Sequence, residues 1–137
     1  MSTSEQLVQA ALAEVITRSV EQARALLGRA DTLFVDVREA IELQREGSVP
    51  GAFHAPRGVL EFWADPQSAW CRPELVQPGV HLLLYCAVGW RSALAAQSLQ
   101  QIGRTGVSHL GGGFAAWKAA GGAVSQLHQA GSKVLTL

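Results

Sequence analysis

The sequence predicts an α/β fold in which an open, mostly parallel sheet carries helices on both faces. Short apolar runs rich in Val, Leu and Phe, such as residues 32–37 and 80–85, are typical of buried parallel strands. Ala- and Leu-rich segments with helix caps lie between these runs, and short connections join them to the strands. In sheets of this kind, ligands bind at the carboxyl ends of the strands.

The expected elements alternate along most of the chain. Strands are predicted at residues 14–17, 32–37, 52–55, 80–85 and 107–110. Helices are predicted at residues 4–13, 19–27, 38–46, 92–102 and 114–120, with a helical turn at 58–63. Ser19 and Gln22 fit the capping box that opens a helix. The proline-bearing residues 65–79 are expected to be mostly loop, and residues 121–137 a trailing arm.

Length and composition indicate a single domain over residues 1–137. The chain is 48% hydrophobic and 16% charged, which suits a compact protein with its own core. Eleven basic and eleven acidic residues cancel, so no net charge favours nucleic acid or an anionic membrane as a partner. No apolar stretch approaches the ~20 residues that span a bilayer, and the N-terminus lacks a secretory signal. We expect a cytoplasmic protein.

The most informative segment is residues 86–92, Cys-Ala-Val-Gly-Trp-Arg-Ser, which follows directly on the apolar run 80–85. A strand there delivers Cys86 to its carboxyl end, Gly89 turns the backbone, and a helix follows. Backbone N–H groups of the loop and the positive end of the helix dipole then converge on one sulfur. Both favour the thiolate, which is the nucleophilic form. The sequence therefore predicts a cysteine-based active site rather than a buried core cysteine.

Cysteine and histidine usage predicts neither a metal nor another cofactor. Cys71 and Cys86 are too few for a disulfide scaffold, and the four histidines, at positions 54, 81, 109 and 128, lack zinc-site spacing. For Cys71, in the proline-bearing loop, an unreactive free thiol is favoured over a thiol that pairs with Cys86. Asp36 ends a buried strand and is expected to join loops by hydrogen bonds, with Arg38 as its neighbour.

Four segments together resemble the rhodanese (sulfurtransferase) family: residues 35–39, residues 49–52, residues 86–92, and residues 111–117 with their three glycines and Trp117. They stand in the order of the family and cover about residues 14–122, between an N-terminal helix and a C-terminal arm. The resemblance implies a persulfide on Cys86. Through it, sulfane sulfur would pass from thiosulfate or a persulfide donor to a thiol, cyanide or protein acceptor.

The same resemblance implies that the cradle around this persulfide consists of Ala87, Val88, Gly89, Trp90 and Arg91. Arg91, the only formal charge of the loop, binds an anionic donor or holds the loop in shape, and both readings stay open. We expect Trp90 to face the pocket. Arg57 is a further candidate for binding an anionic donor at the same mouth, although a solvated surface arginine is favoured over that role.

Two other functions compete with sulfur transfer. A cysteine-based phosphatase or arsenate reductase also holds its cysteine in an anion-binding loop, but places five residues between cysteine and arginine. Only four residues separate Cys86 from Arg91, and the tighter ring suits one sulfur atom better than a phosphoryl group. A non-catalytic regulatory module on the same fold is the second alternative. Retention of cysteine, glycine and arginine in the loop speaks against it.

Overall fold

A computed structural model describes residues 2–126, and its centre is a five-stranded sheet in the order β1-β5-β4-β2-β3. All neighbouring strands of this sheet pair in parallel. The strands are β1 (Ile16–Arg18), β2 (Thr32–Asp36), β3 (Phe53–His54), β4 (His81–Tyr85) and β5 (Val107–Leu110). The predicted fold class is confirmed, and the most apolar predicted strand, β4, lies at the centre of the sheet.

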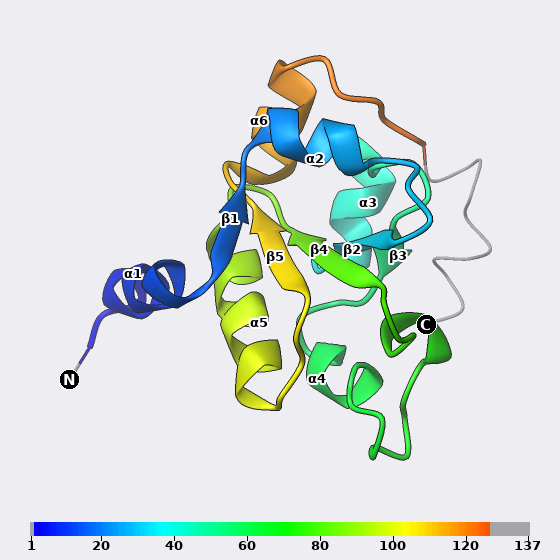
Figure 1. The fold of residues 1–137 in the computed structure, drawn as a ribbon. Coiled ribbons are helices and arrows are strands. Elements are labelled where there is room, and N and C mark those ends of the chain that lie inside the picture. Colours follow the sequence, from blue (N-terminus) through cyan, green and yellow to red (C-terminus); the bar gives the residue numbers. More distant parts are fainter. Residues whose placement is uncertain (1, 127–137) are drawn as a thin grey trace.

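Helices cover both faces of the sheet (Figure 1). Their bounds are α1 (Ser4–Glu14), α2 (Val20–Leu26), α3 (Ala40–Glu46), α4 (Leu60–Trp63), α5 (Trp90–Gln101) and α6 (Gly113–Ala119), with a short 3-10 helix η1 at Pro73–Leu75. Helices α2, α3 and α6 lie on one face, and α4 and α5 on the other. Helix α1 packs on α5 through the buried Val8 and Ala11.

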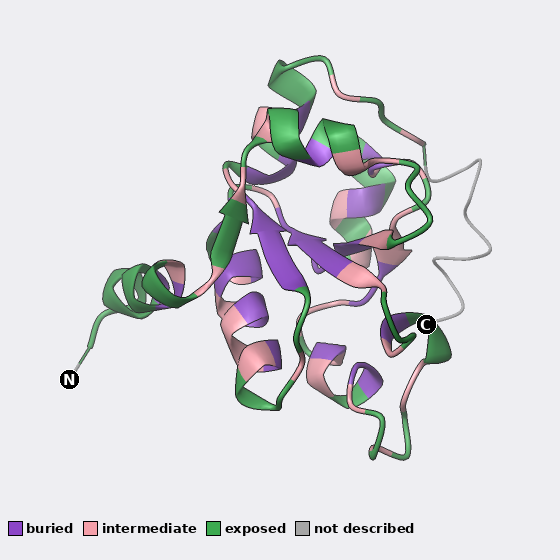
Figure 2. Ribbon diagram, viewed as in Figure 1, coloured by how far each residue is buried: buried purple, intermediate pink, exposed green. Residues whose placement is uncertain are grey.

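The position of β4 between two cores explains why its residues 82–85 are all apolar and do not alternate with polar residues. Leu82 and Leu84 belong to the core beneath α4 and α5, whereas Leu83 and Tyr85 belong to the core beneath α2 and α6. A strand buried on both faces needs apolar residues at every position. Figure 2 shows this burial in the middle of the sheet, while β1 at one edge is largely exposed.

Helices α3 and α5 each begin two residues away from their predicted starts. Helix α3 begins at Ala40 instead of residue 38, because the Arg38 N–H donates to the Asp36 carboxylate and Glu39 takes the N-cap position. Helix α5 begins at Trp90 instead of Ser92. Gly89 has a left-handed φ of 104° and serves as its N-cap. Trp90 therefore lies in the first turn of a helix and not in the loop itself.

Part of the predicted C-terminal arm is fixed to the body of the protein. Ser125 and Ser48 exchange two backbone hydrogen bonds of 2.8 and 2.9 Å, and the Trp117 indole N–H donates to the Ala123 carbonyl. Residues 127–137 of the predicted arm lie outside the described residues. Among the helices of residues 2–126, none has the length and apolar character needed to span a membrane.

Candidate active site

Cys86 follows β4 at the carboxyl edge of the sheet. Contrary to the expectation that it is not a core cysteine, its side chain is only 1% exposed and belongs to the core beneath α4 and α5. The Gly89 N–H donates to Cys86 Sγ at 3.2 Å, and the Ser92 N–H donates to it at 3.3 Å. The second donor, Ser92, stands just beyond the predicted cradle of residues 87–91. Both donors belong to the N-terminal end of the twelve-residue helix α5, where free N–H groups and the helix dipole favour a negative charge.

The three-glycine turn at residues 111–113 holds this loop from behind. The N–H groups of Phe114 and Ala115, at the start of α6, donate to the carbonyls of Cys86 and Ala87 at 2.8 and 3.1 Å. A Cβ on Gly113 would come within 2.6 Å of these same carbonyls, so only glycine allows the approach. Helix α6 thereby fixes the carbonyl side of the loop, while α5 supplies N–H groups to the sulfur.

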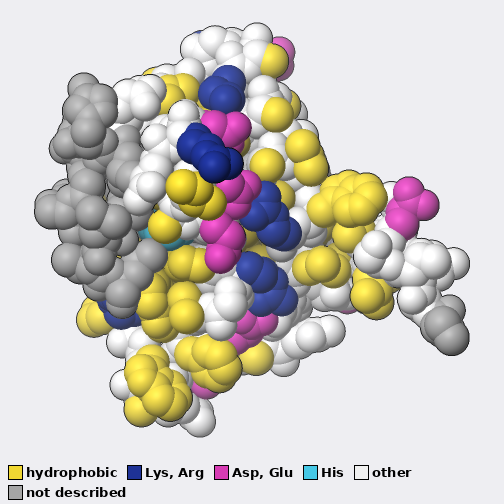
Figure 3. All heavy atoms as spheres, turned by 180° about the vertical axis from the view of Figure 1, so that it is seen from behind, with side chains coloured by type: hydrophobic (Ala, Val, Ile, Leu, Met, Phe, Trp, Pro, Cys, Tyr) yellow, Lys and Arg dark blue, Asp and Glu magenta, His cyan; other side chains and the backbone are white. Residues whose placement is uncertain are grey.

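Arg91 forms a bidentate ion pair with Glu42 on α3, at 2.8 and 2.9 Å. This pairing lowers the pKa of Glu42 from 4.5 to about 2, so the carboxylate stays charged at neutral pH. The only formal charge of the loop is therefore compensated. Nothing in the sequence pointed to Glu42, which stands 49 residues before Arg91. Figure 3 shows a band of acidic and basic side chains that lie side by side on one face of the protein.

A second group behind the sulfur was not predicted. Cys86 Sγ lies 3.5 Å from Ser92 Oγ, which lies 3.0 Å from His109 Nδ1 on β5. His109 Nε2 lies 2.9 Å from the Thr17 hydroxyl on β1. Burial lowers the pKa of His109 from 6.5 to about 4, so its ring is neutral at neutral pH. A neutral histidine therefore stands a single hydroxyl away from the sulfur.

The Asp36–Arg38 pair has the structural role that was predicted. Both side chains are fully buried, with Arg38 Nη2 at 2.8 Å from the Asp36 carboxylate. Arg38 also donates to the Gly47 carbonyl at 2.7 Å, and its guanidinium lies over the Phe114 ring at 4.4 Å. It joins the end of β2 to the end of α3 and to the start of α6.

Other predicted residues lie as follows. Arg57 pairs with Glu61 at 2.6 Å, and Glu61 also accepts a hydrogen bond from Ser98, so Arg57 is engaged on the α4–α5 side of the sheet. Trp90 and Val88 are exposed, at 46% and 60%. Cys71 and Cys86 are both free thiols, with Cys71 half-buried.

His54 is buried, and its Nε2 lies 2.7 Å from the Arg38 carbonyl, while its Nδ1 has no hydrogen-bond partner within the described residues. Within residues 2–126, no cluster of three His, Cys, Asp or Glu side chains is arranged to hold a metal ion.

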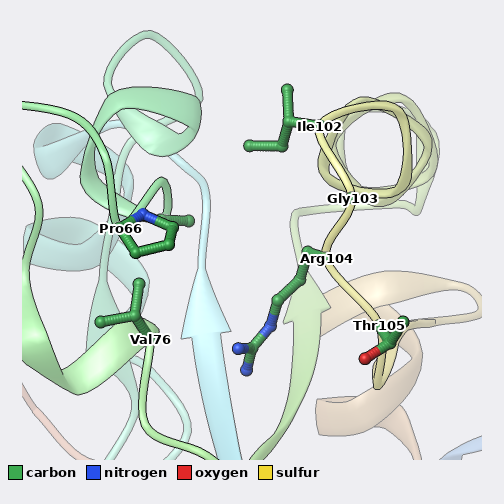
Figure 4. Close-up of a pocket in the computed structure, with 7 residues that line it drawn as sticks. Pro66, Val76, Ile102, Gly103, Arg104 and Thr105 are labelled. Carbon is green, nitrogen blue, oxygen red and sulfur yellow. The ribbon is translucent and has the colours of Figure 1, made fainter.

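A cavity of about 220 Å³ lies away from Cys86, before the amino ends of β4 and β5 (Figure 4). Its wall is formed by Ala64, Pro66, Val76, Ile102, Gly103, Arg104 and Thr105. None of these side chains is a thiol, carboxylate or imidazole. The cavity therefore offers neither a thiol nucleophile nor a general base.

Comparison with known families agrees with this geometry. The family model of the rhodanese-like domain matches residues 19–120. The chain belongs to the rhodanese-like domain family. The match includes β2, the cysteine loop and α6, and so all four segments that carried the resemblance in the sequence.

The proteins similar to this chain include a named sulfurtransferase and others whose function is not known. An uncharacterised Synechocystis protein is 36% identical over 89 residues, 65% of this chain but only 44% of its own length. Human thiosulfate:glutathione sulfurtransferase is 28% identical, over 74% of this chain and 91% of its own. A Rhodopseudomonas palustris structure of unknown function, described as a possible tyrosine phosphatase, has a TM-score of 0.87 at 38% identity. The match covers 91% of this chain and 96% of that one.

Proposed function

We propose that this rhodanese-like protein is a sulfurtransferase that carries sulfane sulfur as a persulfide on Cys86. It would take the sulfur from thiosulfate or a persulfide donor and pass it to a thiol, cyanide or protein acceptor. The observation that carries the proposal is the convergence of two backbone N–H groups, from Gly89 and Ser92, on a single buried sulfur. Such donors stabilise a thiolate, and they can equally hold the negative terminal sulfur of a persulfide.

The reaction needs two displacements at sulfur. In the first, the Cys86 thiolate attacks the sulfane sulfur of the donor, and the donor's S–S bond breaks. The leaving group, sulfite in the case of thiosulfate, departs with the bonding electron pair. In the second, the acceptor attacks the outer sulfur of the persulfide and the Cys86 thiolate leaves. The chain's own part is to hold the negative sulfur in the cradle through both steps.

The surroundings of the loop favour an organic persulfide donor over a small dianion. Arg91 is neutralised by Glu42, so it presents little net positive charge to thiosulfate. Val88 on the loop, Trp90 in the first turn of α5 and Ile41 next to Glu42 in α3 are exposed apolar side chains. Exposed apolar side chains close in sequence to a neutralised ion pair suit a donor or acceptor with a carbon skeleton, such as a low-molecular-weight persulfide or a protein thiol.

The description of the Rhodopseudomonas structure keeps a cysteine phosphatase as the second candidate. Its mechanism would also use Cys86 as nucleophile and Arg91 to bind the phosphoryl group. Two observations disfavour it. Only four residues separate the cysteine from the arginine, and Arg91 already has both its terminal nitrogens on Glu42. A non-catalytic module with the same fold is the third reading.

Intact mass spectrometry separates these functions. The protein is incubated with thiosulfate and, separately, with glutathione persulfide, and we expect one added sulfur atom that cyanide removes. Cys86→Ser should lose the addition, whereas the matched Cys71→Ser variant should keep it. Hydrolysis of p-nitrophenyl phosphate is measured with the same proteins. Cys86-dependent phosphate release without sulfur addition would establish the phosphatase instead, and neither activity would leave the non-catalytic module.

A further inference from the structure

Three side chains connect the buried sulfur of Cys86 with the protein surface. Ser92 Oγ lies 3.5 Å from Cys86 Sγ, His109 Nδ1 lies 3.0 Å from Ser92 Oγ, and Thr17 Oγ1 lies 2.9 Å from His109 Nε2. Cys86, Ser92 and His109 are at most 1% exposed, whereas Thr17 is exposed on the edge strand β1. The group spans α5, β5 and β1, and Thr17 pairs directly with His109 across the two strands.

The four side chains can form a complete chain of hydrogen bonds in which the donors point either away from the sulfur or towards it. With a thiol at Cys86, S–H donates to Ser92 Oγ, the Ser92 hydroxyl donates to His109 Nδ1, and Nε2–H donates to the Thr17 oxygen. With a thiolate, the Ser92 hydroxyl donates to the sulfur, Nδ1–H of His109 donates to Ser92 Oγ, and the Thr17 hydroxyl donates to Nε2. Each arrangement satisfies every polar atom of the group while the imidazole stays neutral.

We propose that Ser92, His109 and Thr17 form a relay that carries the proton of the Cys86 thiol to solvent at Thr17. The S–H proton passes to Ser92 Oγ, the Ser92 proton to Nδ1, the Nε2 proton to Thr17 Oγ1, and the Thr17 proton to water. One proton enters and one leaves, so His109 only changes tautomer. The relay rests on the proposed function, because sulfur transfer requires the thiolate, and it makes His109 a positioning residue.

The electrostatic surroundings suit a neutral relay. On β1, Arg18 donates to Ser108 Oγ, and on β4, His81 bonds to the same Ser108 oxygen, on the other face of β5. At the start of α5, Arg91 is held by Glu42, and Tyr85 at the end of β4 accepts from the Val49 N–H. His109 itself is bonded only to hydroxyl groups among the described residues, and burial lowers its pKa to about 4. A neutral ring can change tautomer without storing charge.

Nitrogen NMR of the His109 and His81 rings tests the relay directly. Ring nitrogen shifts distinguish the Nδ1–H from the Nε2–H tautomer, and they are followed between about pH 6 and about pH 10, where thiols ordinarily titrate. We expect His109 to change from mainly Nε2–H to mainly Nδ1–H as Cys86 loses its proton. His81, which has a similar serine partner but no path to the sulfur, is the internal control and should not follow the thiol.

Three variants make the result decisive. Cys86→Ala should abolish the tautomer change of His109, because no thiol remains to titrate. Thr17→Val should shift the pH of the change, because Nε2 loses its hydrogen-bond partner in both arrangements at unequal cost, and Thr17→Ser, which keeps the hydroxyl, should restore it. Ser92→Ala should raise the pH of half-maximal Cys86 alkylation by iodoacetamide by about one unit or more, because the thiolate loses a hydroxyl donor. The alkylation is measured in a Cys71→Ser background, so that only one thiol reacts.

A single tautomer of His109 throughout the titration would overturn the relay, as would an equal change in Cys86→Ala. A Thr17→Val protein whose His109 changes tautomer at the same pH as in wild type would also overturn it, since Thr17 would then have no part in the hydrogen-bonded group that reverses its direction. These measurements use free protein without a sulfur donor. Failure of the relay is therefore distinguishable from failure of the sulfurtransferase, which the mass measurement reports independently.

Discussion

Two arginine–carboxylate pairs of similar geometry have different positions in this protein. Arg38 and Asp36 meet at 2.8 Å with both side chains fully buried. Arg91 and Glu42 also meet at 2.8 Å, but their side chains are 39% and 26% exposed. A buried pair cannot lose one partner without leaving a charge in the core, whereas water can solvate what remains of an exposed pair. We infer that the first pair holds the fold and the second sets the charge beside the cysteine loop.

The largest change in the free energy of unfolding is expected from the substitution Arg38→Met. The substitution leaves the Asp36 carboxylate buried without its partner and removes the hydrogen bond to the Gly47 carbonyl. The free energy of unfolding should fall by about 3–5 kcal/mol, measured by urea denaturation. The double variant Asp36→Asn/Arg38→Met should recover part of this loss, because it removes the orphaned charge. A loss near 1 kcal/mol for Arg38→Met would mean that the buried pair is no more structural than the exposed one.

Arg91→Met is the matched substitution at the exposed pair. We expect it to cost about 1 kcal/mol or less in unfolding free energy, because Glu42 can be solvated. Its effect should appear in function instead. The uncompensated Glu42 would repel a dianion, and sulfur loading from thiosulfate should slow by about tenfold. Arg91→Met/Glu42→Gln removes both charges and should regain most of the rate, whereas an equally slow double variant would assign Arg91 a direct contact with the donor.

The fold and the cysteine loop could be predicted because their signals are local. A run of apolar residues gives β4, and the cysteine, glycine and helix that follow it lie within a few residues of one another. The start of α5 was misplaced by two residues, because sequence does not state that Gly89 adopts the left-handed conformation that caps a helix. Trp90 was accordingly assigned to the loop instead of the helix.

The partners of the site were missed because they come from elsewhere in the chain. Glu42 stands 49 residues from Arg91, His109 stands 17 residues from Ser92, and Thr17 stands 92 residues from His109. No motif spacing links such residues in one sequence. The pairing of neighbouring strands could have identified one of these partners, Thr17. Once β1 is placed beside β5, Thr17 and His109 become direct neighbours on the same face.

The smallest expected effect is the pH dependence of the stability that the exposed Arg91–Glu42 pair provides. The pKa of Glu42 lies at about 2 in the folded protein and near 4.5 when unpaired, so the unfolded chain takes up its proton first as the pH falls. The stability that Arg91 gives to Glu42 is therefore complete above pH 4.5 and is lost between pH 4.5 and about 2. Unfolding free energies of wild type and Glu42→Gln, measured at each pH, should converge over this window.

His109 titrates close by and must be separated from this effect. Burial lowers its pKa from 6.5 to about 4, so its contribution to stability is complete above pH 6.5 and falls as the pH drops towards 4. Because wild type and Glu42→Gln share His109, its contribution cancels in their difference, which should stay constant from pH 6.5 down to 4.5. A difference that stays constant from pH 4.5 down to about pH 2 would show that Glu42 is not held by Arg91 in solution, and the rim of the cysteine loop would then carry a free positive charge.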